Sequence, residues 1–259
     1  MQISAIVNTH AESDVVLDTL DSIKTYMTDQ IVTVVDGDCG KIPSSIQGCM
    51  HHSYRAPFRN MAFGMLNVIE KFPNSDWYCY LEYDCLIASS RFKENLKLAD
   101  DMNVWMLGND GHVDDVKIPI IESLVGEKLK SPYYLIGACQ FFSQKFIQKL
   151  NEINFFNRFL NLTNGMADGV FPHYNGYDIS EHMYPTLARH FGGNIGVFAT
   201  YDYVKRKWHG SYRYFPIRWK PELDSDNENF EEASILHPLK SFDHPIRIYH
   251  RNKRNSHVI

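Results

Sequence analysis

The chain has 259 residues, of which 44% are hydrophobic and 14% aromatic, and its formal net charge is −5. This length suits one large α/β domain or two small ones, and the negative charge argues against a protein that binds nucleic acid by neutralising phosphates. No basic and apolar leader opens the sequence and no run is long enough to span a bilayer, so we expect a cytoplasmic protein. Five cysteines without a C-x-x-C pair predict reduced, buried thiols.

The first part of the chain alternates between apolar runs and helical periodicity. Ile3–Val7 and Ile31–Val35 predict strands, and apolar side chains between them, over residues 14–27, recur at intervals of three and four. A continuous apolar strand is buried on both faces, and strand-helix-strand order predicts a parallel sheet. Further strands are expected at 76–81, 103–107 and 133–142, and further helices near 60–72, 92–98, 143–153 and 180–191. The glycines at 108 and 111 are expected to close one strand in a turn, and the acidic residues 222–232 to form a mobile surface loop.

Two carboxylates, Glu82 and Asp84, follow the apolar run that ends at Leu81. In extended backbone, residues two apart point to the same side, so both acids would face one side at the end of a buried strand. A buried carboxylate is costly unless a positive group meets it, and Mg²⁺ or Mn²⁺ bound with a substrate phosphate would supply that charge. The alternative is an ordinary strand end whose acids lie in water.

Several polar residues come at the carboxyl ends of predicted parallel strands, where ligands bind in sheets of this kind. They are Thr9, His10, Asp36, Glu82 and Asp84. The sequence contains neither G-x-G-x-x-G after the first strand nor G-x-x-x-x-G-K-[ST]. A bound nucleotide would therefore be held by side chains and a metal rather than by a glycine-rich loop.

Four stretches resemble motifs of GT-A glycosyltransferases, the nucleotide-sugar transferases, and of their family 2 in particular. Glu82-Tyr83-Asp84 is similar to the D-x-D motif, and Arg59-Asn60 resembles the "ARN" element. Gly176 to Arg189, which contains Glu181-His182, resembles the "G..ED..L..R" stretch, and His237-Pro238-Leu239-Lys240 resembles a late histidine and lysine of several GT-A enzymes.

The resemblance implies an α/β fold of GT-A (Rossmann-like) type, with a mostly parallel central sheet flanked by helices in a single domain. Residues 1–110 would form the nucleotide-sugar-binding half and residues 111–235 the acceptor-side half. Residues 236–259 would be a C-terminal segment that closes over the site. The basic tail, Arg247 to Arg254, is expected to be a solvated terminus or, alternatively, to make peripheral contact with an anionic membrane.

The resemblance also implies roles for the site residues. Asp84 would bind the metal directly and Glu82 directly or through water, and a His237 nitrogen would favour Mn²⁺ over Mg²⁺. Lys240 would reach a phosphate, Arg59 the diphosphate or nucleobase, and Asp36 the base or ribose, while Thr9 and His10 line the same pocket. Plainer alternatives are a turn cap for His237, a turn at Asp36-Gly37 and a surface salt bridge for Arg59.

Three residues are candidates for the base that would deprotonate the acceptor hydroxyl. Where the inverting enzymes have Glu-Asp, this chain has Glu181-His182, so Glu181, His182 or Asp178 could take the role. A retaining enzyme would need no such base, and Glu181 would then only stabilise the start of a helix.

The sequence thus predicts a metal-dependent glycosyltransferase of polysaccharide biosynthesis. It would move a sugar from a nucleoside diphosphate donor, UDP-linked, to a hydroxyl of a saccharide or glycoconjugate acceptor. The alternatives are a nucleotidyltransferase that makes sugar nucleotides and a noncatalytic nucleotide- or carbohydrate-binding module of the same fold. The donor sugar, the linkage and the oligomeric state are not predicted.

Overall fold

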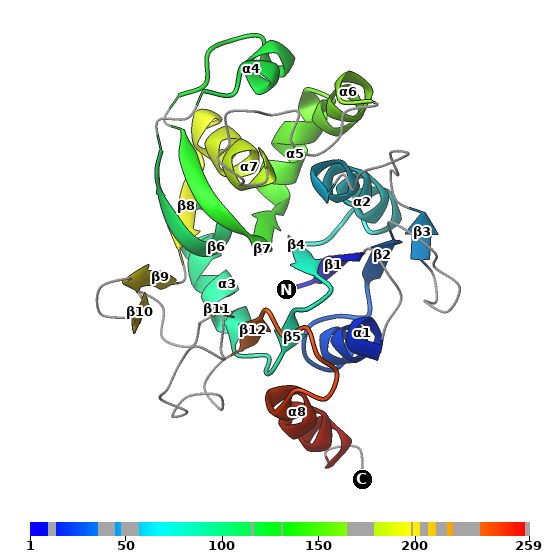
Figure 1. Ribbon diagram of the computed structural model, residues 1–259. Coiled ribbons are helices and arrows are strands. Elements are labelled where there is room, and N and C mark those ends of the chain that lie inside the picture. The colour runs from blue at the N-terminus through cyan, green and yellow to red at the C-terminus, as the bar shows by residue number, and fades with distance from the viewer. Residues whose placement is uncertain are drawn as a thin grey trace.

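A seven-stranded sheet runs through the molecule, and helices cover both of its faces (Figure 1). The strand order is β3-β2-β1-β4-β7-β6-β8, and β7 is antiparallel to both of its neighbours while the other pairs are parallel. The strands are β1 (Ile3–Thr9), β2 (Ile31–Val35), β3 (Ser45–Gln47), β4 (Trp77–Glu82), β6 (Val104–Val113), β7 (Tyr133–Ser143) and β8 (Asn194–Val197). The predicted α/β class with a mostly parallel central sheet is therefore confirmed.

The computed structural model describes most of the chain. The described residues are 1–9, 14–35, 45–47, 57–114, 117–130, 132–164, 179–197, 199–202, 207–210, 217–219 and 234–256. The predicted loop at 222–232 lies outside these ranges. None of the described helices is both long and apolar enough to cross a bilayer.

Two smaller groups of strands accompany the main sheet. One has the order β11-β12-β5, and the other pairs β9 with β10. Their bounds are β5 (Leu86–Ile87), β9 (Ala199–Asp202), β10 (Lys207–Gly210), β11 (Ile217–Trp219) and β12 (Ile235–His237). β5 follows β4 directly in the chain, so the β12–β5 pairing brings a late segment next to the end of β4.

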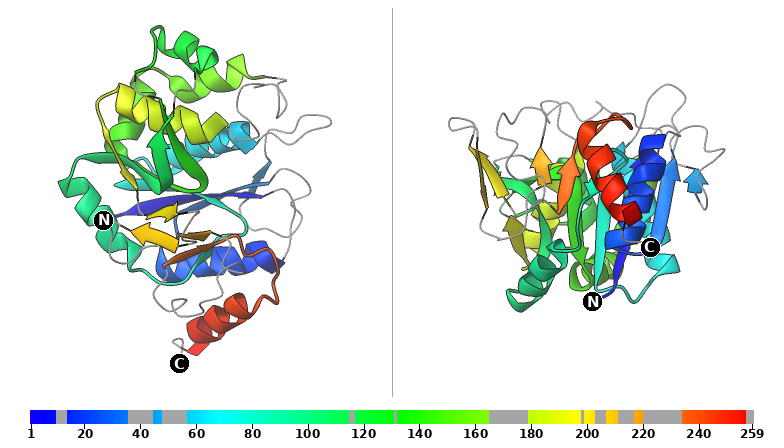
Figure 2. Two further views of the ribbon diagram at one scale, coloured as in Figure 1. Left: turned by 60° about the vertical axis from the view of Figure 1, so that its left-hand side comes forward. Right: turned by 90° about the horizontal axis from the view of Figure 1, so that it is seen from below.

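The helices form two layers, one on each face of the main sheet (Figures 1 and 2). On one face lie α2 (Pro57–Lys71), α4 (Pro119–Val125), α5 (Gln144–Glu152), α6 (Phe155–Leu162) and α7 (Ile179–His190). On the other lie α1 (Asp14–Tyr26) and α3 (Phe92–Asp101), with α8 (Pro245–Ser256) beside α1. Alternate residues of β1 serve the two cores, because Ile6 packs on the first face while Ala5 and Val7 pack on the second.

The predicted end of the strand at 103–107 is wrong. β6 continues to Val113, with register shifts between Leu107 and Asn109 and between Asn109 and His112. A Cβ on Gly108 would lie 2.8 Å from a methyl carbon of Leu135 on the neighbouring strand. The glycine therefore lets the Leu135 side chain approach the backbone of an irregular strand, and it does not mark a turn.

Three helices were not predicted: α4, α6 and α8. The first two are short, with seven and eight residues, which is too few turns for a clear periodic pattern. α8 replaces the expected solvated terminus, and its arginines at 247 and 254 are buried.

Gly64→Ala will test how closely α2 packs on the sheet. A Cβ at Gly64 would lie 2.6 Å from Cγ2 of Ile6 and 2.9 Å from Cγ2 of Val34, so the methyl group must displace both buried side chains. Overpacking outweighs the better helix propensity of alanine, and we expect a net loss of about 1–2 kcal/mol in the free energy of unfolding. Urea titration measures this loss, and Glu70→Ala on the exposed side of the same helix should change stability by less than about 0.5 kcal/mol. Equal effects of the two substitutions would contradict the close packing.

Candidate functional site

The end of β4 and the end of β12 come together although they are far apart in the sequence. β4 ends at Glu82, and the chain turns through Asp84 into β5, which pairs antiparallel with β12 (Figure 1). This pairing sets Leu236 opposite Leu86, so the next residue of β12, His237, reaches the turn that carries Asp84. The Leu239 amide also donates a hydrogen bond of 2.9 Å to the Asp84 carbonyl. Two backbone connections therefore hold the histidine segment against the acidic turn.

His237 contacts both acidic side chains through one nitrogen. Its Nε2 lies 3.1 Å from Oε2 of Glu82 and 3.1 Å from Oδ1 of Asp84. The three side chains differ in exposure, with Asp84 at 2%, His237 at 4% and Glu82 at 43%. The cluster thus has a buried carboxylate–imidazole pair and one carboxylate that reaches solvent.

The protonation of the cluster follows from these contacts. Burial by itself would lower the pKa of His237, but the hydrogen bonds and charges of Asp84 and Glu82 outweigh burial and raise its pKa from 6.5 to about 9. Burial would raise the pKa of Asp84, but His237, with a smaller contribution from Lys240, lowers it. At neutral pH the pair is an imidazolium beside a carboxylate, so a proton supplies the positive charge that the buried acid requires.

A divalent cation would fit the same position. Among the described residues, Oδ1 of the buried Asp84 has no partner besides Nε2 of His237, which it shares with Oε2 of Glu82. An oxygen that shares its single donor with a second carboxylate is well placed to be a metal ligand. Neutral His237 would add a nitrogen and Glu82 a further oxygen, a mixed set that suits Mn²⁺.

Cys85 lies in the same cluster but is not suited to be a ligand. Its Sγ, an oxygen of Asp84 and a ring nitrogen of His237 all lie within 4.8 Å of one another. The thiol donates to the Ala138 carbonyl at 3.2 Å, and burial raises its pKa well above the usual value. The thiolate form that binds metals is therefore disfavoured, and Cys85 belongs to the apolar core. The thiols of Cys79, Cys85 and Cys139 are free and buried, as the sequence predicted.

Of the remaining residues predicted to bind the donor, the structure describes three, Thr9, Arg59 and Lys240. Thr9 is the last residue of β1, and because Asn8 pairs with Glu82, Thr9 lies at the same edge of the sheet. Lys240 is exposed, and its charge acts on Asp84. His10 and Asp36 lie outside the described residues.

Arg59 makes contacts other than those predicted from the sequence. Its Nη1 donates to the Leu160 carbonyl at 2.7 Å and to Oγ1 of Thr163 at 2.6 Å. These carbonyl and hydroxyl groups lie at the end of α6, so the arginine connects α2 to α6 in the interior. No salt bridge of Arg59 is among the interactions of the described residues, and its predicted contact with the donor stays a prediction.

Glu181 and His182 lie in the first turn of α7 but have different surroundings. Oε1 of Glu181 accepts a hydrogen bond of 2.8 Å from the Gly137 amide on β7. Gly137 lies two residues before Cys139, which pairs with Leu81, so the partly exposed Glu181 carboxylate lies near the edge where β4 ends.

His182 is buried, and its Nε2 lies 2.9 Å from Oδ2 of Asp114. Its ring centroid is 5.1 Å from that of Tyr134. Burial lowers its pKa more than Asp114 raises it, so the imidazole is neutral at pH 7. No spacing rule indicated Asp114 or Gly137 in the sequence, because both act across strands. Asp178, the third candidate base, lies outside the described residues.

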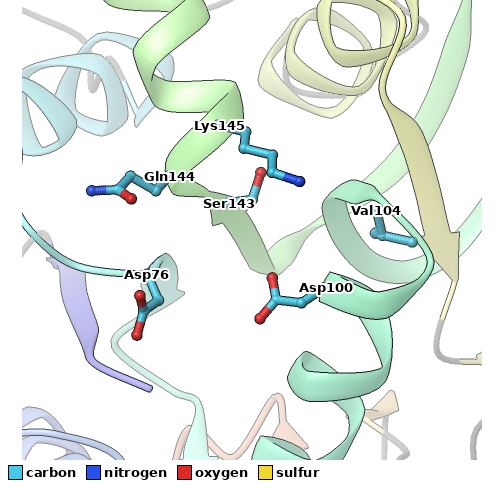
Figure 3. A pocket seen from close by; sticks show the side chains of 6 residues that line it. All are labelled: Asp76, Asp100, Val104, Ser143, Gln144 and Lys145. Carbon is cyan, nitrogen blue, oxygen red and sulfur yellow. The ribbon is translucent and has the colours of Figure 1, made fainter.

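A separate pocket of about 270 Å³ lies at the opposite end of β4 (Figure 3). Its lining residues are Asp76, Asp100, Val104, Ser143, Gln144 and Lys145. Asp76 precedes the first residue of β4 whereas Glu82 is the last, so this pocket is not part of the cluster around Asp84. Burial raises the pKa of Asp100, and the charge of Asp76 adds to that shift.

Comparison with known proteins finds similarity among solved structures only, because no protein-family model and no curated protein sequence matches the chain. A glycosyltransferase involved in the glycosylation of the major capsid of PBCV-1 is 12% identical with a TM-score of 0.46, over 99% of this chain and 100% of its own. The mannosyltransferase PcManGT from Pyrobaculum calidifontis, in complex with GDP-Man and Mn²⁺, is 11% identical with a TM-score of 0.41, over 76% of this chain and 54% of its own.

A further match is 4-diphosphocytidyl-2C-methyl-D-erythritol synthase from Anaerococcus prevotii. It is 15% identical with a TM-score of 0.40, over 76% of this chain and 87% of its own. These values describe a distant similarity of fold to GT-A-type glycosyltransferases and to this synthase. The chemistry therefore has to be argued from the residues of the site.

The protonated His237 predicts a pH dependence of stability in the metal-free protein. A pKa raised from 6.5 in the unfolded chain to about 9 in the folded one adds stability that is complete below pH 6.5 and is lost as the pH rises to 9. The expected loss is roughly 3 kcal/mol in the free energy of unfolding, measured by urea titration in EDTA at intervals of pH. His237→Gln removes the titrating group and should abolish this loss. Parallel pH profiles for the two proteins would contradict the ion pair.

Proposed function

We propose that the protein is a metal-dependent glycosyltransferase that moves a sugar from a nucleoside diphosphate donor, UDP-linked, to a hydroxyl of a saccharide or glycoconjugate. The observation that carries the proposal is the cluster of Glu82, Asp84 and His237 at the carboxyl end of β4. Ligands of parallel sheets bind at this edge, and the buried Asp84 there already requires a cationic partner.

In this proposal Asp84 and neutral His237 hold Mn²⁺, and Glu82 adds a ligand directly or through water. The metal would act as a Lewis acid that stabilises the charge on the departing diphosphate. Lys240 is exposed beside the cluster and contributes a positive charge to a phosphate oxygen. Thr9 lines the same edge of the sheet, and Asp36 and His10 are proposed to contact the nucleoside.

Glu181 is the proposed base. The acceptor hydroxyl oxygen bonds to the anomeric carbon, the bond from that carbon to the diphosphate oxygen breaks, and the hydroxyl proton passes to the Glu181 carboxylate. Glu181 is supported over His182 because its carboxylate is partly exposed and held by the Gly137 amide, whereas the His182 ring is buried against Asp114. A base in this role implies inversion at the anomeric carbon.

Nucleotide binding that depends on manganese is the first expected result. UDP with Mn²⁺ should raise the thermal midpoint of the wild-type protein, because a ligand at 100 times its Kd stabilises the native state by about 2.7 kcal/mol. UDP in EDTA should have no effect, and Asp84→Asn should remove the effect of UDP with Mn²⁺. GDP and CMP, tested in the same way, identify which nucleobase the donor site accepts.

Asp100→Asn is the matched control, because it neutralises a carboxylate at the opposite end of β4 and should leave the response to UDP and Mn²⁺ intact. Indifference of the wild-type protein to all three nucleotides would refute the proposed donor site. Binding without release of UDP from any sugar donor in the presence of acceptors would favour the noncatalytic module.

Glu181→Gln should lower kcat by ~10²–10⁴-fold while UDP and Mn²⁺ still bind, because only proton removal from the acceptor is lost. His182→Gln should cost less than about tenfold if Glu181 is the base. Release of UDP from a donor in the presence of saccharide acceptors gives the rates, and NMR of the product gives the anomeric configuration. A retained configuration, or a larger loss in the His182 variant, would overturn the assignment of Glu181.

A further inference from the structure

We propose that Arg247 of α8 is a positioning residue that holds the two ligand-bearing segments of the metal site together. The inference rests on the metal site proposed above, but the contacts that support it belong to the described structure. Arg247 is completely buried, although it lies eight residues beyond Leu239 and outside the cluster of ligands.

The guanidinium of Arg247 contacts three separate parts of the chain. Its Nη1 donates to Oδ2 of Asp18 at 2.7 Å, and its Nε donates to the Leu239 carbonyl at 2.9 Å. Its Nη2 donates to Oγ1 of Thr19 at 3.1 Å and lies 3.5 Å from the Cys85 carbonyl. The planar guanidinium group has several N–H donors in fixed directions and can bond to all of these acceptors at once. A lysine ammonium group is a compact charge and cannot reach them all from one position.

These contacts converge on both sides of Asp84. Oγ1 of Thr19 lies 2.6 Å from the Tyr83 carbonyl and 2.7 Å from the Cys85 carbonyl, so Thr19 holds the carbonyls of the residues on either side of Asp84. Arg247 orients that hydroxyl by donating to it.

The histidine segment is fixed by the same side chain. Arg247 holds the Leu239 carbonyl, while the Leu239 amide donates to the Asp84 carbonyl. His237 lies two residues before Leu239. Arg247 therefore reinforces the backbone connections that set the distance between the Asp84 carboxylate and the His237 imidazole, although it hydrogen-bonds to neither group.

The neighbouring arginines of α8 contact acidic residues of α1. Arg254 forms a short contact with Oδ1 of Asp18 and a hydrogen bond of 3.0 Å with Oδ2 of Asp21, and Nη1 of Arg251 lies 3.7 Å from Asp18. All three arginines thus contact Asp18 of α1 and lie on the face of α8 that meets this helix. Figure 2 shows α8 beside α1. The side chains of Arg247 and Arg254 are buried against α1.

Arg247→Lys and Arg247→Met, compared with Arg254→Lys and Arg254→Met, test the proposal. Both positions pair with Asp18, but Arg254 has no described contact with the Cys85 or Leu239 carbonyl, so its variants report the loss of a buried ion pair alone. Mn²⁺ affinity is measured from the electron paramagnetic resonance signal of free Mn²⁺. Hydrogen exchange of the Leu239 amide is measured in the metal-free proteins.

We expect both Arg247 variants to weaken Mn²⁺ binding at least tenfold and to speed exchange of the Leu239 amide at least tenfold. The Arg254 variants should lower the thermal midpoint but keep both values within about twofold of the wild type. Arg247→Lys retains the charge beside Asp18 and keeps the test open if Arg247→Met does not fold. Unchanged Leu239 exchange in Arg247→Lys, or equal changes in the Arg254 variants, would overturn the proposal.

The two proposals fail in different ways. If the wild-type protein binds no Mn²⁺ while Leu239 exchange rises only in the Arg247 variants, the metal site is wrong and the positioning of the two segments stands. If the wild-type protein binds Mn²⁺ and the Arg247 variants bind it equally well, the metal site stands and the positioning role is refuted.

Discussion

The carboxylate of Asp84 is almost completely buried, and a buried carboxylate destabilises a fold unless a positive group meets it. His237 is that group, although it lies 153 residues later in the chain than Asp84. Its contact with Glu82 spans 155 positions. The β12–β5 pairing and the Leu239–Asp84 hydrogen bond serve this one requirement. The architecture around the end of β4 is therefore a means of keeping an opposite charge beside one acid.

The two acids of the triplet have unequal freedom. The Asp84 side chain is fixed by its buried surroundings. The Glu82 side chain, at the end of the strand, is nearly half exposed and can change its rotamer. A rigid inner ligand and an adjustable outer one would let the same cluster meet either a proton or a larger cation without rearrangement of the backbone. The carboxylate of Glu181 on α7 lies near the same edge of the sheet, where the Gly137 amide holds it.

The sequence predicted what depends on local pattern. The strand that ends in Glu82 and the alternation of strands and helices follow from periodicity, and the resemblance to known motifs indicated His237. The role of Arg247 could not be predicted, because its acid, Asp18, is 229 positions away and no spacing rule relates the two residues. The arginine repeat at 247, 251 and 254 did carry a signal, since residues spaced by four and three share one face of a helix. Arg59 matches a motif, and its contacts with Leu160 and Thr163 join two helices, which no spacing rule indicated.

The pairing of β12 with β5 has a consequence for the order in which a newly made molecule matures. A nascent polypeptide that has left the ribosome as far as β7 already contains six of the seven strands of the central sheet, and both acids at its rim. Those acids have no histidine until β12 has been synthesised, so a half-made chain holds two repelling charges where the finished one holds an ion pair. The charge cluster would then be completed in the last stage of folding, after the bulk of the core has formed.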